Sequence, residues 1–89
     1  MSPEQELREL KYELNKDRMK GKIDFKNMIQ ETKNDNTYLR ITCTNKKAAN
    51  NIQSRYVEKM SSYTYINFDG IKNPSTENRY IYFVIHNYN

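Results

Sequence analysis

Residues 79–86 read RYIYFVIH, and this stretch decides the fold. Tyr80 and Tyr82 alternate there with an apolar set, Ile81, Phe83 and Ile85. Alternation with a period of two is typical of a β-strand that buries one of its faces. We therefore expect a strand from about residue 79 to residue 86, with its apolar side on the core and its tyrosines on the opposite side.

Two earlier stretches show the same alternation. Residues 37–44 place an apolar set, Leu39, Ile41 and Cys43, on one side of a strand, and residues 63–68 do the same with Ile66 and Phe68. The other side carries one tyrosine in the first stretch and two in each of the others. If the strands share one sheet, the face opposite the core carries Tyr38, Arg40, Tyr63, Tyr65, Tyr80 and Tyr82.

The first of three expected helices has clear ends. It begins after Ser2, which forms a Ser-x-x-Gln capping box with Gln5, and it ends at Gly21. Its apolar stripe is narrow and consists of Leu7, Leu10 and Leu14. That stripe can pack on the sheet or against a second copy of the chain, so a homodimer through these leucines stays open.

Two more helices are expected between the first helix and the second tyrosine strand. A short one would begin at Asp24, because Phe25, Met28 and Ile29 would share one helical face before residues 34–36 break the pattern. A longer one would follow Thr44 or Asn45. Its buried stripe recurs at every fourth residue, with Ala48 or Ala49 followed by Ile52, Tyr56 and Met60.

The expected fold class is α+β, in the order α-α-β-α-β-β, with a small three-stranded sheet packed by helices. Residues 1–89 would form a single domain, in which residues 1–36 are a helical segment on or beside the sheet and residues 37–89 a β-α-β-β core. In topology this core resembles half of a ferredoxin-like two-layer sandwich. The alternative is a winged helix, with residues 46–59 as recognition helix and the last two strands as wing.

Composition limits the class of protein. The chain has 89 residues, a mean hydropathy of −1.09, a net charge of +4 and a pI near 9.2, which favours phosphate-bearing or acidic partners. Cys43 is the only cysteine, so we expect a buried thiol in a reducing compartment. With an acidic start and no apolar run of membrane length, we expect a cytoplasmic protein. The heavy use of Asn, Lys, Ile and Tyr, which have A/T-rich codons, suggests a phage, virus or mobile element, and then the host cytoplasm.

No catalytic or metal-binding pattern is present in the sequence. His86 is the only histidine and Cys43 lies half a chain away, whereas metal sites and catalytic triads need several converging side chains. We therefore expect no enzyme, no metal and no cofactor.

The tyrosine face predicts a nucleic-acid-binding protein. Aromatic rings on a sheet stack nucleobases, and a basic helix carrying Lys46, Lys47 and Arg55 would add phosphate contacts. The expected partner is RNA or DNA, with single strands favoured. The alternative is an inhibitor or adaptor that blocks a host protein, since tyrosine-rich patches also suit protein interfaces. Both hypotheses require that the N-terminal helices leave the tyrosines accessible.

Overall fold

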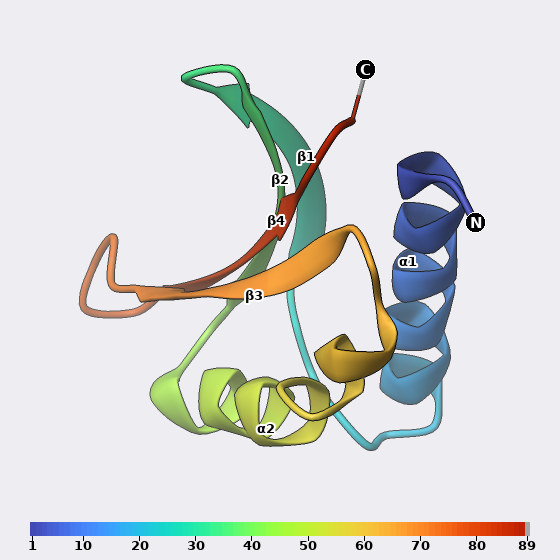
Figure 1. Ribbon diagram of the computed structural model, residues 1–89. Coiled ribbons are helices and arrows are strands. Elements are labelled where there is room, and N and C mark those ends of the chain that lie inside the picture. The colour runs from blue at the N-terminus through green and yellow to red at the C-terminus, as the bar shows by residue number, and fades with distance from the viewer. Residues whose placement is uncertain (89) are drawn as a thin grey trace.

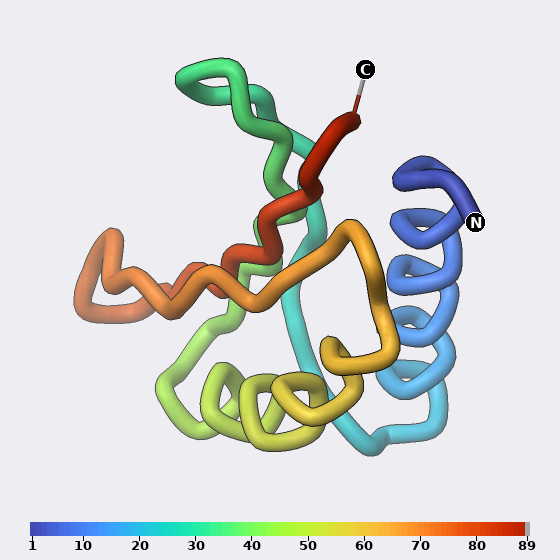
Figure 2. The backbone as a smooth tube through the Cα atoms, in the orientation of Figure 1, coloured from blue at the N-terminus to red at the C-terminus, as the bar shows by residue number. Residues whose placement is uncertain are grey.

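Four strands form one antiparallel sheet in the computed structural model, which describes residues 1–88. The elements are α1 (Pro3–Met19), β1 (Asn27–Lys33), β2 (Asn36–Cys43), α2 (Lys46–Tyr56), the short 3-10 helix η1 (Lys59–Ser62), β3 (Ile66–Lys72) and β4 (Arg79–Ile85). Both α-helices lie on the same side of the sheet (Figure 1). The loops of the hairpins β1–β2 and β3–β4 project away from the helices (Figure 2).

The predicted three-stranded sheet and the order α-α-β-α-β-β are wrong. The observed order is α-β-β-α-β-β, because the segment expected as a second helix forms strand β1. Asn34 and Asp35 both have positive φ angles, 52° and 67°, which is the geometry of a two-residue hairpin turn. Lys33 pairs with Asn36 across that turn, so the chain folds back onto β2. The winged-helix alternative is wrong as well, since two strands directly precede α2 in the chain, and α2 therefore has no preceding helix with which to form a helix-turn-helix.

The strand order in the sheet is β1-β2-β4-β3. Because β4 is antiparallel to both of its neighbours, β2 and β3 run parallel to each other with β4 between them. The connection from β2 to β3 passes through α2, which is the usual way to join parallel strands. β4 therefore lies inside the sheet, and β1 and β3 form its edges.

The ends of α1 follow its sequence. The Ser2 hydroxyl accepts from the Gln5 amide at 3.1 Å, and the Gln5 side chain accepts from the Ser2 amide at 2.7 Å, which completes the predicted capping box. At the other end Gly21 has a φ of 73°. The Gly21 and Lys22 amides donate to the carbonyls of Arg18 and Asp17, a pattern that closes many helices at a glycine.

The core lies between the helices and the apolar face of the sheet. α1 contributes Leu7, Leu10 and Leu14, all buried. α2 contributes the predicted stripe of Ala49, Ile52 and Tyr56, with Met60 of η1 beside it. The sheet contributes Leu39, Ile41, Cys43, Ile66, Ile81, Phe83 and Ile85. The leucines that were open to a dimer role thus attach α1 to the sheet of its own chain.

Two buried carboxylates fix α1 in this place. Asp17 accepts from the Tyr56 hydroxyl at 2.6 Å and from Arg55 Nε at 3.0 Å, which joins α1 to α2. Burial alone would raise the pKa of Asp17, but the bonds from Tyr56 and Arg55 and the charges of Arg55 and Lys59 lower it. Glu6 accepts from the amides of residues 64 and 65 at 2.7 and 2.6 Å, which joins α1 to the start of β3.

Neither α-helix within residues 1–88 is both long enough and apolar enough to cross a membrane.

Candidate nucleic-acid interface

The face of the sheet opposite the helices carries tyrosine and basic side chains. In the register, Arg40 lies opposite Tyr82, Thr42 lies opposite Tyr80, and Lys72 lies on the far side of Tyr80. Residues directly opposite each other point to the same side of a sheet. We call this side the outer face, defined by Tyr38, Arg40, Tyr80, Tyr82 and Lys72. Within the described chain no helix covers it (Figure 1).

Three tyrosine rings form a continuous aromatic cluster on the outer face. The rings of Tyr38 and Tyr82 meet edge to face with centroids 5.9 Å apart, and those of Tyr82 and Tyr80 meet likewise at 6.2 Å. Such edge-to-face pairs stabilise each other by about 0.5–1.5 kcal/mol beyond the area that they bury. The rings are half-buried, so their positions are fixed while part of each stays exposed.

Cations lie over two of the three rings. The Arg40 guanidinium is 4.5 Å from the centroid of Tyr80, and Lys72 Nζ is 5.4 Å from the centroid of Tyr82. Arg40 also pairs with Glu31 of β1, with 2.7 Å between Nη1 and Oε1. The Arg40 Nε is buried without a hydrogen-bond partner in the described residues. Arg40 therefore contacts both the Tyr80 ring on β4 and the Glu31 carboxylate on β1.

Two of the predicted tyrosines lie outside this cluster. Tyr63 follows η1 and packs against the core. Burial, with the charges of nearby α1 carboxylates, raises its pKa to about 12. The Tyr65 carbonyl accepts from the His86 amide at 2.7 Å. Tyr65 thus lies beside His86, which is four positions along the chain from Tyr82, or about 13 Å at ~3.3 Å per strand residue. This distance separates Tyr65 from the ring cluster.

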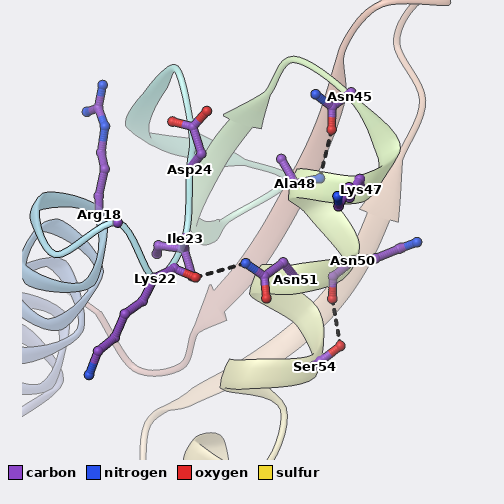
Figure 3. Close-up of a pocket in the computed structure, with 11 residues that line it drawn as sticks. Arg18, Lys22, Ile23, Asp24, Asn45, Lys47, Ala48, Asn50, Asn51 and Ser54 are labelled. Atoms are coloured by element: carbon purple, nitrogen blue, oxygen red, sulfur yellow. Dashed lines mark hydrogen bonds between the residues drawn. The ribbon is translucent and has the colours of Figure 1, made fainter.

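The three predicted helix cations also lie outside the outer face, since α2 packs on the other side of the sheet. Arg55 is bound to Asp17 at 3.0 Å and has a structural role. Lys46 lies at the start of α2, where it lines a hollow together with Arg79. Lys47 lines a wide groove of about 700 Å³ between the end of α1 and α2, shown in Figure 3.

The groove in Figure 3 does not bring its cations together. Arg18 and Lys22 extend in different directions in this view, and the Arg18 guanidinium lies 4.6 Å from the ring of Phe25. The Asn45 side chain accepts from the Ala48 amide at 2.8 Å, so the start of α2 is capped by its own chain. The tyrosine cluster, rather than this groove, is the stronger candidate site.

Charged residues that the sequence prediction missed complete the outer face. Lys72 belongs to the second half of β3, and Glu31 and Lys33 belong to β1, the strand predicted as a helix. All three side chains, together with Asp69, line a hollow between the two hairpins. In residues 1–88 no three His, Cys, Asp or Glu side chains are placed to share a metal ion.

Comparison of the chain with protein-family models, with curated proteins and with solved structures gives no match in any of the three.

Proposed function

We propose that this protein binds single-stranded nucleic acid on the outer face of its sheet. The observation that carries the proposal is that Tyr38, Tyr80 and Tyr82 form one ring cluster with two cations on a face free of helices. Rings on a sheet stack unpaired bases, and adjacent cations attract the phosphates that link them.

The outer face offers two places on which a base can stack, the Tyr38 ring and the Arg40 guanidinium. Among the described residues no cation lies over the Tyr38 ring, so its exposed part is free to stack a base directly. Arg40 lies on Tyr80, and a guanidinium plane also stacks bases. Each stacked base contributes about 1–3 kcal/mol. Two bases would thus supply about 2–6 kcal/mol of the about 8 kcal/mol that a micromolar affinity requires.

Single strands fit this surface better than a duplex does. The bases of a duplex are stacked on one another, so their ring faces are closed to protein side chains. No helix within residues 1–88 projects from the outer face to enter a groove. Lys33 and Lys72 line the same hollow as Tyr38 and Tyr82, and with two or three phosphate contacts the affinity should fall with salt with a log–log slope of about −1.4 to −2.1.

The test is a titration of a fluorescent oligothymidylate with the protein at about 50 mM salt. Tyr38→Ala should weaken binding about 5- to 150-fold, the equivalent of one lost stack. Tyr12→Ala is the matched control, because Tyr12 is 64% exposed and belongs to α1, which packs on the side of the sheet opposite the outer face. This control should bind like the wild type.

Two results would refute the proposal. One is the absence of measurable binding to single-stranded DNA and RNA at about 50 mM salt. The other is equal weakening by Tyr12→Ala and Tyr38→Ala, because then the outer face has no special part in binding. Stable capture of a protein partner that competes with the oligonucleotide for Tyr38 would instead favour the inhibitor or adaptor hypothesis.

A further inference from the structure

Strand β3 contains an extra residue where it crosses the outer face. Phe68 lies opposite Phe83 and Gly70 lies opposite Tyr82, so Asp69 is inserted between two regular pairs. This is a β-bulge, in which two residues of one strand oppose a single residue of its neighbour. Asp69 and Gly70 therefore both lie beside Tyr82, the central ring of the aromatic cluster. Bulges often redirect a side chain next to a functional site.

The space around this bulge is open. A Cβ atom at Gly70 would meet no atom within 4 Å, and its φ of 135° is a conformation that favours glycine. A hollow of about 160 Å³ lies on the outer face, between Tyr38 of one hairpin and Asp69 and Tyr82 of the other. At ~30 Å³ for each water, this volume equals roughly five waters, which suits one planar heterocycle.

The two carboxylates that line the hollow differ in their partners. Glu31 is bound to Arg40 at 2.7 Å. Asp69 is exposed, and no side chain in the described residues forms an ion pair or a hydrogen bond with its carboxylate. An ionised carboxylate accepts hydrogen bonds and cannot donate them. Asp69 therefore favours a ligand that presents N–H groups.

We propose that this hollow is a base site selective for guanine, an inference that rests on the proposed function. Guanine presents two neighbouring donors, N1–H and the N2 amino group, which match the two oxygens of one carboxylate. Adenine and cytosine present one amino group next to a ring-nitrogen acceptor. Thymine and uracil present one N–H between two carbonyl oxygens, which the carboxylate repels. With the base stacked on Tyr38, Lys33 and Lys72 are placed for the flanking phosphates.

The experiment compares oligothymidylates of one length that carry a single central guanine, adenine or hypoxanthine, or no replacement. The wild type should bind the guanine oligonucleotide about tenfold more tightly than the all-thymine one, as expected of a two-bond contact to one base. Hypoxanthine lacks the N2 amino group and should lose most of that preference. Asp69→Asn should abolish the preference while binding to oligothymidylate persists.

Asp24→Asn is the matched control, because it removes an exposed carboxylate that lines the groove beside α2, away from the outer face. It should keep the guanine preference. Equal wild-type affinity for all four oligonucleotides would overturn the guanine site and leave the proposed function standing. Tighter binding of every oligonucleotide by Asp69→Asn would also overturn it, because Asp69 would then only repel phosphate. No binding to any of them would overturn both proposals.

Discussion

Replacing Asp17 by asparagine tests how α1 is held on the inner side of the sheet, away from the tyrosines. Asp17 is 4% exposed and accepts charged hydrogen bonds from Tyr56 and Arg55. Asparagine keeps an acceptor for Tyr56 but loses the charge, which costs about 1 kcal/mol. The bond to Arg55, whose side chain is 35% exposed and therefore screened, adds about 1 kcal/mol. We expect Asp17→Asn to lower the free energy of unfolding by roughly 2 kcal/mol, or the melting temperature by roughly 10 °C.

Urea unfolding followed by far-ultraviolet circular dichroism measures this loss at pH 7. Glu13→Gln is the control: it breaks the ion pair with Lys59, whose atoms are 3.5 Å apart and whose side chains are 30% and 43% exposed, and it should cost under about 0.5 kcal/mol. Tyr56→Phe should cost about 1 kcal/mol, and the double variant with Asp17→Asn should lose less than the sum, because both changes act on the same Tyr56–Asp17 hydrogen bond.

The loss of unfolding free energy in Asp17→Asn should also depend on pH, and it should be smaller in acid. The pKa of Asp17 is lower in the folded protein than its ordinary value of 3.8, so its stabilising effect is complete above that value. It is lost as the pH falls through the folded pKa. The difference in the free energy of unfolding between wild type and Asp17→Asn should therefore shrink below about pH 4. A cost under about 0.5 kcal/mol at pH 7, or additive effects of the Asp17 and Tyr56 changes, would refute this account.

Three further predictions concern other parts of the fold. Glu6→Gln should destabilise the protein by about 2 kcal/mol in urea, because a buried carboxylate that accepts from two amides loses its charge; no change would mean that these bonds do not secure α1. Asp35→Gly should raise the melting temperature, with a gain of about 0.5–1 kcal/mol, because the position has a φ of 67°; a loss would contradict the hairpin turn. Burial, with the charge of Asp24, raises the pKa of Cys43 to about 11, so at pH 8 a thiol reagent should label it only as fast as the protein opens. Rapid labelling of the folded protein would place this thiol outside the core.

The parts of the fold that local patterns specify were predictable. α1 has a capping box at one end and a glycine at the other, and both were recognised in the sequence. The central strands β2 and β4 alternate buried and less buried residues over most of their length, so they show the period of two that marks a strand.

Strand β1 was missed because it lies at the edge of the sheet. Met28 is only half-buried and Ile29 is 40% exposed, so no clean alternation marks the strand. The positions of Phe25, Met28 and Ile29 fit a helical face equally well. The available signal was the pair Asn34-Asp35, since both residue types tolerate the positive φ angles of a hairpin turn.

The candidate site was predictable in part. Tyr38, Arg40, Tyr80 and Tyr82 converge because they lie on two neighbouring strands that alternate regularly. Lys72 was missed because Asp69-Gly70 is a strong turn signal, whereas here it forms a bulge within a continuing strand. The α2 cations were predicted to add phosphate contacts to the rings, whereas α2 packs on the side of the sheet opposite the ring cluster.

The most direct test of the nucleic-acid hypothesis is a nuclear magnetic resonance titration of the isotope-labelled protein with a short single-stranded oligonucleotide. We expect the ring signals of Tyr38, Tyr80 and Tyr82 to shift upfield together as bases stack on them, while those of Tyr12 and Tyr63 stay in place. Shifts confined to residues of α1 or α2, with the outer-face rings unchanged, would contradict it.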